Sequence, residues 1–363
     1  MIIIGADTHK RSHSLGAVDG QTAAVVGERT IRADEAGHLA ALRWARELDT
    51  ERLWAIEDCR HVSRRLEQAL LAAGERVIRV PPKLMGASRR GERQPGKSDQ
   101  IDALAVARAV LREGVERFPV AFLDEQAMEI RLLADHRDDL VAERTKAQNR
   151  LRWHLLELCP ELEASLPKRS LDREAQLERI ARRLRRLPGS ARVKVARELV
   201  AHIRQLTRQA DALEKELRAR IRAHRPQLLE ETGCGPLVAA TLIGHTAGAE
   251  RFATDAHFAR QAGVAPIPVS SGNSTRHRLH RGGDRQLNRA LHMIAITRAA
   301  HDPETRAYLE RKKTEGKTGR EAIRCLKRHL ARRFHRLLAG AEAPRPAAAR
   351  IPGGAPTPMV CLT

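Results

Sequence analysis

Met1-Ile-Ile-Ile-Gly-Ala-Asp7, at the start of the chain, is a continuous apolar run that ends in a carboxylate. Such a run predicts a buried strand. A second apolar run, Leu53-Trp-Ala-Ile-Glu57, ends in the same way. Asp99 and Asp102 lie three residues apart in a predicted helix, so they share one helical face. Two strand ends and one helix turn can therefore bring four carboxylates together.

Four clustered carboxylates repel one another, so a folded site that contains them needs a counter-charge. Divalent Mg²⁺ is the usual one, because hard oxygen ligands suit it. Each residue alone is weak evidence, since Asp often ends a strand and Asp99 also favours the helix dipole one residue after a predicted cap. Taken together, Asp7, Glu57, Asp99 and Asp102 predict a magnesium site.

The charge of the chain indicates a polyanionic partner. The 363 residues carry a formal net charge of +21, and the sequence pI is about 10.9. Nucleic acid is the default partner for such an excess, although a solvated basic surface is the alternative. Aromatic residues make up only 2%, so contacts with backbone phosphates should dominate over base stacking, and binding should weaken steeply with salt.

Cysteine usage and hydropathy favour a cytoplasmic protein. The five cysteines are odd in number and form no CxxC pair, so neither a zinc site nor a disulfide framework is supported. No run approaches 18 apolar residues, and the N-terminus lacks an apolar stretch of signal-peptide length. We expect no membrane association, and we expect a bacterial protein that associates with the nucleoid when it acts.

The first third of the chain, residues 1–115, alternates predicted strands and helices. Their order, β-β-β-α-β-α-β-α, resembles the ribonuclease H-like fold. A segment rich in Gly, Arg and Pro, from Gly86 to Gly96, predicts a mobile basic loop that leads into the Asp99/Asp102 helix. The predicted strands are 2–7, 13–18, 23–31, 53–57 and 77–80, and the predicted helices are 35–48, 62–73 and 98–111.

Residues 123–225 are predicted to be almost entirely helical. From Leu199 to Ile221, apolar residues recur at 4,3 spacing, which is typical of a coiled-coil seam. A second helix is predicted from Glu125 to Leu158, and a very basic segment, Arg179 to Arg197, lies between the two. We expect this region to join subunits into a dimer or tetramer and to clamp nucleic acid. The alternative is a plain helical hairpin within one chain.

Residues 226–340 are predicted to form helices interrupted by a loop from Ala265 to Asp284, and the tail 341–363 is predicted to be disordered. Ser271 lies in that loop beside Gly272. A serine hydroxyl becomes a nucleophile only when a base or a metal removes its proton, so an ordinary basic loop with turn serines is the alternative. The arginines that could hold a phosphate are Arg276, Arg278, Arg281 and Arg285.

In these motifs the chain resembles the DEDD-type transposases of the IS110 insertion-sequence family, which are bridge-RNA-guided DNA recombinases related to the Piv invertases. The resemblance spans about residues 1–340. It rests on Gly5-Ala-Asp7, Ile56-Glu57, Lys97-Ser-Asp99-Gln-Ile-Asp102-Ala, and a C-terminal block that runs from Ala262-Gly-Val-Ala-Pro266 through Ser271-Gly272 and Gly282-Gly283 to Asn288-Arg289-Ala290-Leu291.

The resemblance implies an N-terminal RuvC-like domain and a C-terminal transposase domain, joined by a coiled coil. It implies that Asp7, Glu57, Asp99 and Asp102 bind Mg²⁺. It also implies that the serine of the Ser-Gly step attacks DNA; we assign this role to Ser271, and the doubled serine leaves Ser270 as an alternative. A structured guide RNA is the further partner that the family implies.

We therefore expect a transposase that excises and inserts its own mobile element through serine attack on DNA. A Holliday-junction resolvase that uses water on the same carboxylates is the first alternative. A non-catalytic nucleic-acid-binding scaffold is the second. A covalent protein–DNA adduct separates the first two functions, and metal-independent binding without cleavage would indicate the third.

Overall fold

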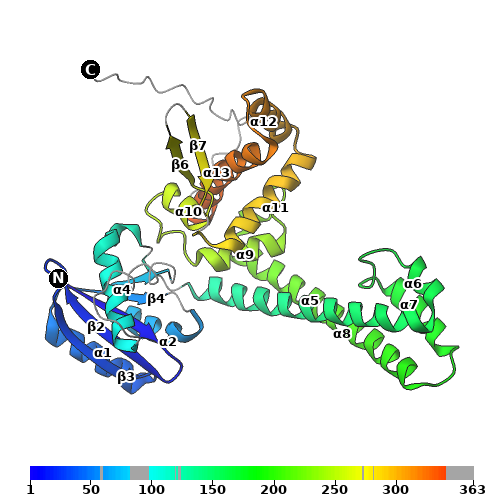
Figure 1. The fold of residues 1–363 in the computed structure, drawn as a ribbon, viewed down its shortest axis with the longest axis horizontal. Helices are drawn as coiled ribbons and strands as arrows, with labels where there is room; N and C mark the ends of the chain where they lie inside the picture. Colours follow the sequence, from blue (N-terminus) through cyan, green and yellow to red (C-terminus); the bar gives the residue numbers. More distant parts are fainter. Residues whose placement is uncertain are drawn as a thin grey trace.

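The computed structural model describes residues 1–57, 60–81, 98–118, 120–121, 124–271, 274–280 and 282–340. The predicted basic loop from Gly86 to Gly96, Arg281 and the tail from Ala341 lie outside this part of the chain. The described residues form a mixed α/β part, a long helical hairpin and a mostly helical C-terminal part (Figure 1).

The α/β part confirms the predicted order of strands and helices. Its strands form one mixed sheet in the order β3-β2-β1-β4-β5. β1 pairs antiparallel with β2 and parallel with β4, and β4 pairs parallel with β5. The elements are β1 (Ile2–Thr8), β2 (Ser12–Asp19), β3 (Val25–Arg32), α1 (Glu35–Leu48), β4 (Arg52–Glu57), α2 (Arg60–Ala72), β5 (Val77–Val80) and α4 (Asp99–Glu113).

Helices cover both faces of the sheet, because alternate residues of a strand point to opposite sides. Ile4 and Trp54 pack with apolar residues of α1 and α2 on one face. Ile3 and Leu53 pack with α4 on the other face. The strands are therefore buried on both sides, which explains why the two runs that form β1 and β4 are continuously apolar.

Gly5 allows α4 to lie directly on the sheet. A Cβ atom at this position would come within 2.0 Å of the carbonyl oxygen of Ala103 and 2.7 Å of the backbone nitrogen of Ala107. Glycine therefore permits a close approach of helix and strand. This approach places the first turn of α4 beside the end of β1.

Side-chain caps fix where two of these helices begin. The Asp34 side chain accepts a hydrogen bond from the backbone N–H of Gly37, at 2.9 Å, and thereby caps α1. The Ser98 hydroxyl accepts a hydrogen bond from the backbone N–H of Ile101, at 3.3 Å, and caps α4. Each cap satisfies a backbone donor that the helix itself leaves unpaired.

Two helices of 34 residues each, α5 (Glu125–Leu158) and α8 (Ala191–His224), form the long hairpin. α6 (Pro160–Ser165) and α7 (Glu174–Arg185) lie at its tip (Figure 1). The two long helices run antiparallel, since Arg220 bonds to Glu129 at one end and Arg192 pairs with Glu157 at the other. The apolar side chains between them are buried at both ends of the hairpin.

The apolar seam of α8 is buried inside one chain. Leu199, Ile203 and Leu206 are at most 6% exposed, and Leu217 and Ile221 are fully buried. A second copy could reach this seam only by displacing α5. The seam residues themselves therefore pack within one chain, as in the alternative reading of a helical hairpin. That residues 123–225 join subunits stays a prediction.

The C-terminal part has its own apolar core, to which the base of the long hairpin contributes Ile130 and Leu217. Phe258 and Phe334 are fully buried at its centre. Its elements are α9 (Pro236–Thr246), α10 (Asp255–Gln261), β6 (Pro266–Ser271), β7 (Ser274–Leu279), α11 (Arg285–His301), α12 (Pro303–Thr314) and α13 (Gly319–Leu338).

The segment predicted as a loop from Ala265 to Asp284 contains a two-stranded antiparallel hairpin, so this prediction was wrong in part. β6 and β7 pair from Pro266 with Leu279 to Ser271 with Ser274. The prolines of β6 concealed the strand in the sequence, because proline cannot donate a ladder hydrogen bond and is confined to sheet edges. Both strands of a two-stranded ribbon are edge strands, so the prolines of β6 can be accommodated in it.

Candidate functional site

The ends of β1 and β4 bring two of the predicted acids side by side. The parallel register pairs Ala6 with Ile56, one residue before Asp7 and Glu57. Residues an even number of positions apart in a strand point to the same face of the sheet. Asp7 lies four residues after Ile3, and Glu57 lies four residues after Leu53, so both acids belong to the face that α4 covers. Asp7 is only 6% exposed, whereas Glu57 is half-buried.

The first turn of α4 supplies the other two acids. Asp102 is 6% exposed, and it lies one residue before Ala103, whose carbonyl faces Gly5 of β1. Asp99 is the first residue of the helix and is exposed. The structure thus places all four predicted carboxylates at one corner of the α/β part, where two strands end and one helix begins.

His9 joins this corner, and sequence reasoning missed it. Its Nε2 atom lies 3.1 Å from Oδ2 of Asp7 and 3.4 Å from Oδ1 of Asp99. Asp7, His9 and Asp99 each offer a ligand atom, and these atoms all lie within 4.8 Å of one another. Within the described chain, Glu57 and Asp102 are not part of that tight group.

The fold perturbs the ionisation of Asp7. Burial raises the pKa of its carboxyl above the ordinary value, the neighbouring His9 lowers it, and the negative charges of Asp102 and Asp99 raise it further. A buried carboxyl among acidic neighbours is a group that a bound cation would stabilise in its ionised form. The donor set of carboxylate and imidazole fits a divalent metal ion, and it does not by itself select one.

The predicted serine lies on the β6–β7 hairpin. Ser271 is the last residue of β6, and its backbone pairs with Ser274 of β7. Arg278 lies on β7 opposite Ile267, and Arg285 is the first residue of α11; both are exposed. The side chains of Ser270, Ser271 and Arg276 lie outside the described residues, as does the whole of Arg281.

The carboxylates and the serine hairpin occupy different parts of the chain. In Figure 1 the β6–β7 hairpin rises from the C-terminal part, on the side away from the sheet that carries Asp7 and Glu57. The structure therefore assembles the acidic cluster within one chain, but it does not bring Ser271 to this cluster.

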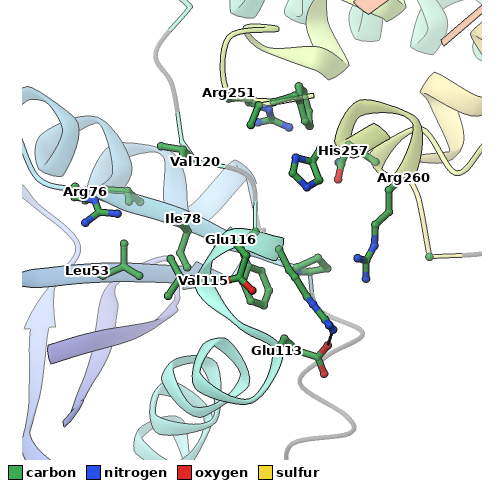
Figure 2. Close-up of a pocket in the computed structure, with 18 of the residues that line it drawn as sticks. Leu53, Arg76, Ile78, Glu113, Val115, Glu116, Val120, Arg251, His257 and Arg260 are labelled. Carbon is green, nitrogen blue, oxygen red and sulfur yellow. Dashed lines mark hydrogen bonds and ion pairs between the residues drawn. The ribbon is translucent and has the colours of Figure 1, made fainter. Parts of the chain in front are cut away.

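A cavity of about 560 Å³ lies between the α/β part and the C-terminal part (Figure 2). Leu53, Ile78 and Glu116 line one side of it, and Arg251 and His257 line the other. Leu53 lies near the start of β4, four residues before Glu57. This cavity is therefore at the opposite end of the strand from the carboxylates, and it is not part of their site.

Two family models match the chain. One, described as a transposase, matches residues 4–160. The other, described as the transposase IS116/IS110/IS902 family, matches residues 226–310. The first match contains the acidic cluster, and the second contains the β6–β7 hairpin.

Relatives that resemble the chain come from insertion elements. An uncharacterized protein of insertion element IS110 from Streptomyces coelicolor is 31% identical, over 69% of this chain and 73% of its own length. Uncharacterized proteins of IS116 from Streptomyces clavuligerus and IS900 from Mycobacterium paratuberculosis are 27% and 28% identical. Their matches cover 90% and 89% of this chain, and 92% of each relative.

Among solved structures, T. thermophilus RuvC in complex with a Holliday junction substrate aligns with 31% of this chain and 96% of its own. The identity is 18% and the TM-score is 0.25, which is too low to support an argument. Of the helices that the structure describes, none has the length and apolar character needed to span a membrane.

Proposed function

Because the chain belongs to the IS110 family of transposases, we propose that it excises and inserts a mobile element by serine attack on DNA phosphodiesters. The observation that carries this proposal is the convergence of Asp7 and Asp99, with His9 between them, at the end of β1. A DNA-processing enzyme needs such a corner to stabilise the charge that develops on a phosphodiester. We assign to the α/β part, residues 1–115, a RuvC-like catalytic role.

The residues proposed to hold the metal are Asp7, Glu57, Asp99 and Asp102. Asp7 and Glu57 come from a rigid sheet, and the other two come from a helix seated on it through Gly5. Divalent Mg²⁺, when bound, would stabilise both the attacking and the leaving oxygens of an in-line displacement. The chain contributes fixed, partly dry ligand positions, and burial of Asp7 and Asp102 keeps water from competing for them.

Ser271 is the proposed nucleophile. Its hydroxyl oxygen forms a bond to phosphorus and the hydroxyl proton passes to a base, while the bond to the 3′ oxygen breaks and the departing oxygen takes up a proton. The products are a 5′-phosphoserine and a free 3′-hydroxyl, which conserve the energy of the phosphodiester for strand exchange through a junction. Arg276, Arg278, Arg281 and Arg285 are proposed to hold the backbone phosphates around the hairpin.

A complete site in this proposal uses two copies of the chain. The acidic cluster and the β6–β7 hairpin lie apart within one chain (Figure 1), so a serine from one copy would meet carboxylates from another in a homo-oligomer. Residues 226–340 would form the transposase domain. Residues 123–225 would join subunits and set the distance between the acidic cluster and the β6–β7 hairpin. A structured RNA from the element is proposed to select the DNA.

The experiment is the capture of a covalent adduct. Wild-type protein, Mg²⁺ and RNA transcribed from the element's flank are mixed with a nicked DNA substrate that spans the element's end. Denaturing electrophoresis should show a protein–DNA adduct, and Ser271→Ala should remove it while Ser270→Ala keeps it. Peptide mapping identifies the linked residue. Cleavage by Ser271→Ala without any adduct would instead support a resolvase that uses water.

A further inference from the structure

A second cavity, of about 520 Å³, lies between the β6–β7 hairpin and the helices α12 and α13. We call it the α12–α13 pocket. Its walls come from Pro266 and Arg278 on the hairpin, from Tyr308 and Lys312 on α12, and from Arg324 on α13. No residue of the acidic cluster lines it, and Arg278 is the member of the predicted arginine set found among the described lining residues.

The lining of the α12–α13 pocket is strongly cationic. Two acids face it, and both are already engaged: Glu315 accepts a hydrogen bond from Lys312 at 2.7 Å, and Glu321 caps α13 through Thr318. Over the described chain, Arg324 makes no ion pair or side-chain hydrogen bond. The cationic side chains that line the pocket are Arg278, Lys312, Lys317, Arg324, Lys327 and Arg328.

Tyr308 supplies a second, independent observation. It is 3% exposed, and its hydroxyl is buried with no hydrogen-bond partner among the described residues. Burying an unpaired hydroxyl is unfavourable, so such a group normally finds an acceptor. The ring is held in place edge-on to His329, with centroids 5.5 Å apart, and beneath Lys312. The phenol is thus a fixed donor that lacks an acceptor.

The floor of the pocket is tied to the base of the serine hairpin. Lys327 is 6% exposed, and its Nζ atom donates to Oδ1 of Asn288 at 2.6 Å. The Asn288 amide in turn donates to the carbonyl oxygens of Ala262 and Gly263, at 3.0 and 2.9 Å. These two residues precede β6. A group held in the pocket is therefore fixed relative to the strand that leads to Ser271.

We propose that the α12–α13 pocket binds a backbone phosphate of the nucleic-acid strand that crosses the β6–β7 hairpin. A phosphodiester carries negative charge and offers only acceptors, which suits an unpaired hydroxyl donor among arginines and lysines. Arg278 and Arg324 supply charge, and Tyr308 supplies the neutral donor. This inference rests on the proposed function only in its statement of which nucleic-acid strand is bound.

The bound phosphate is not the one that Ser271 would attack. The Ile267–Arg278 pair lies four residues along β6 from Ser271, which is about 13 Å at the rise of a strand. The pocket would therefore hold a neighbouring phosphate and set the register of the strand on the hairpin. Tyr308 and Arg324 are positioning residues in this proposal, not catalytic ones.

The test measures binding without catalysis. Full-length protein in EDTA is titrated into fluorescent single-stranded DNA, and into RNA of the same sequence, while anisotropy is recorded. Tyr308→Phe removes one oxygen and Arg324→Gln removes one charge; each should weaken binding roughly fivefold to tenfold. Arg336→Gln, which removes an exposed charge from α13 outside the pocket, should change binding less than twofold. Melting curves check that every variant folds.

Methylphosphonate scanning of the oligonucleotide then locates the phosphate. A methylphosphonate at one position should weaken binding by the wild-type protein. The same substitution should cause no further loss of affinity in Tyr308→Phe or Arg324→Gln. If both variants bind like Arg336→Gln, or if no position behaves in this way, the proposal is overturned. Stabilisation by inorganic phosphate that Tyr308→Phe abolishes, with oligonucleotide binding unchanged, would instead assign the pocket to free phosphate. All of these measurements report binding, so they remain valid even if the protein shows no strand transfer and the proposed function is wrong.

Discussion

The Nε2 atom of His9 lies 3.1 Å from Oδ2 of Asp7. His9 is in the short connection between β1 and β2, and its backbone N–H donates to the carbonyl oxygen of Ser12. The turn therefore folds the imidazole back over the strand end. The imidazole and the carboxylate therefore present a nitrogen and an oxygen ligand atom together at the end of β1.

Asp7→Asn should stabilise the metal-free protein and abolish its response to Mg²⁺. The folded pKa of Asp7 is raised, chiefly by burial, so the stability tied to its proton is present below the ordinary value near 4. That stability is lost as pH rises through the folded pKa. The variant avoids this loss at pH 7. Mg²⁺ at about 100 times its Kd should stabilise wild type by about 2.7 kcal/mol and the variant by far less.

Thermal melting with and without Mg²⁺, in EDTA-treated protein, measures both effects of this substitution. Asp211→Asn, which removes an exposed charge from α8, is the matched control and should respond to Mg²⁺ like wild type. Strand transfer by Asp7→Asn should fall more than about 100-fold, while nucleic-acid binding should change little, since it comes from Lys and Arg. Equal Mg²⁺ stabilisation of Asp7→Asn and wild type would remove Asp7 from the metal site.

Gly5→Ala should separate α4 from the sheet. The added methyl group would meet backbone atoms of Ala103 and Ala107, which cannot turn aside as a side chain can, so we expect a loss of about 3 kcal/mol or more. The Mg²⁺ response should weaken too, because Asp99 and Asp102 move with the helix. Urea denaturation measures the first effect. Gly189→Ala is the control, because a Cβ at this position meets no described atom within 4 Å. It should change neither the stability nor the Mg²⁺ response.

Local signals in the sequence were sufficient for the α/β part. The apolar runs ending at Asp7 and Glu57, and the caps Asp34 and Ser98, each depend on neighbours in the chain. The structure confirms these strands and helices and brings the four acids to one corner. The contact of His9 with Asp99 could not be predicted in this way, because it depends on how the β1–β2 turn lies over the start of α4.

The helical hairpin shows why partner choice was harder to predict. A 4,3 apolar seam from Leu199 to Ile221 buries equally well against another helix of the same chain or against a second copy. In the folded chain, antiparallel ion pairs such as Glu129 with Arg220 and Glu157 with Arg192 join α8 to α5. The β6–β7 hairpin was missed for another reason: the prolines of β6 and the arginine-rich sequence that follows it outweighed the short β-branched alternation of Ile267 and Val269.

Leu206→Ala should destabilise the hairpin without changing the mass of the particle. Leu206 is 3% exposed within one chain, so truncation leaves a cavity and should cost about 2–5 kcal/mol. Leu132→Ala, on a 54% exposed side chain of α5, should cost less than about 0.5 kcal/mol. Denaturation and multi-angle light scattering measure the two properties. A smaller particle formed by folded Leu206→Ala would restore the seam as a subunit contact.

His13 and His38 form a buried pair behind the sheet, on the face opposite the acidic cluster. Their rings stack with centroids 5.5 Å apart, and their Nε2 atoms lie 3.4 Å apart. Burial, and then the proximity of His38, lowers the pKa of His13 to about 4. The His13 Nδ1 atom has no hydrogen-bond partner in the part of the chain that the structure describes. The fold thus holds His13 neutral.

His13→Leu should reduce the loss of stability in mild acid. Below the ordinary His pKa near 6.5, His13 of the unfolded chain binds a proton. In the folded chain His13 stays neutral down to about pH 4, because its pKa is lowered to about 4. The contribution is therefore complete above about pH 6.5 and declines as pH falls. Urea denaturation at about pH 7 and pH 5, followed by fluorescence of the buried Trp44 and Trp54, reports on the α/β part. His136→Leu, at an exposed position of α5, is the matched control. An equal decline in wild type and His13→Leu would show that this pair does not set the acid sensitivity.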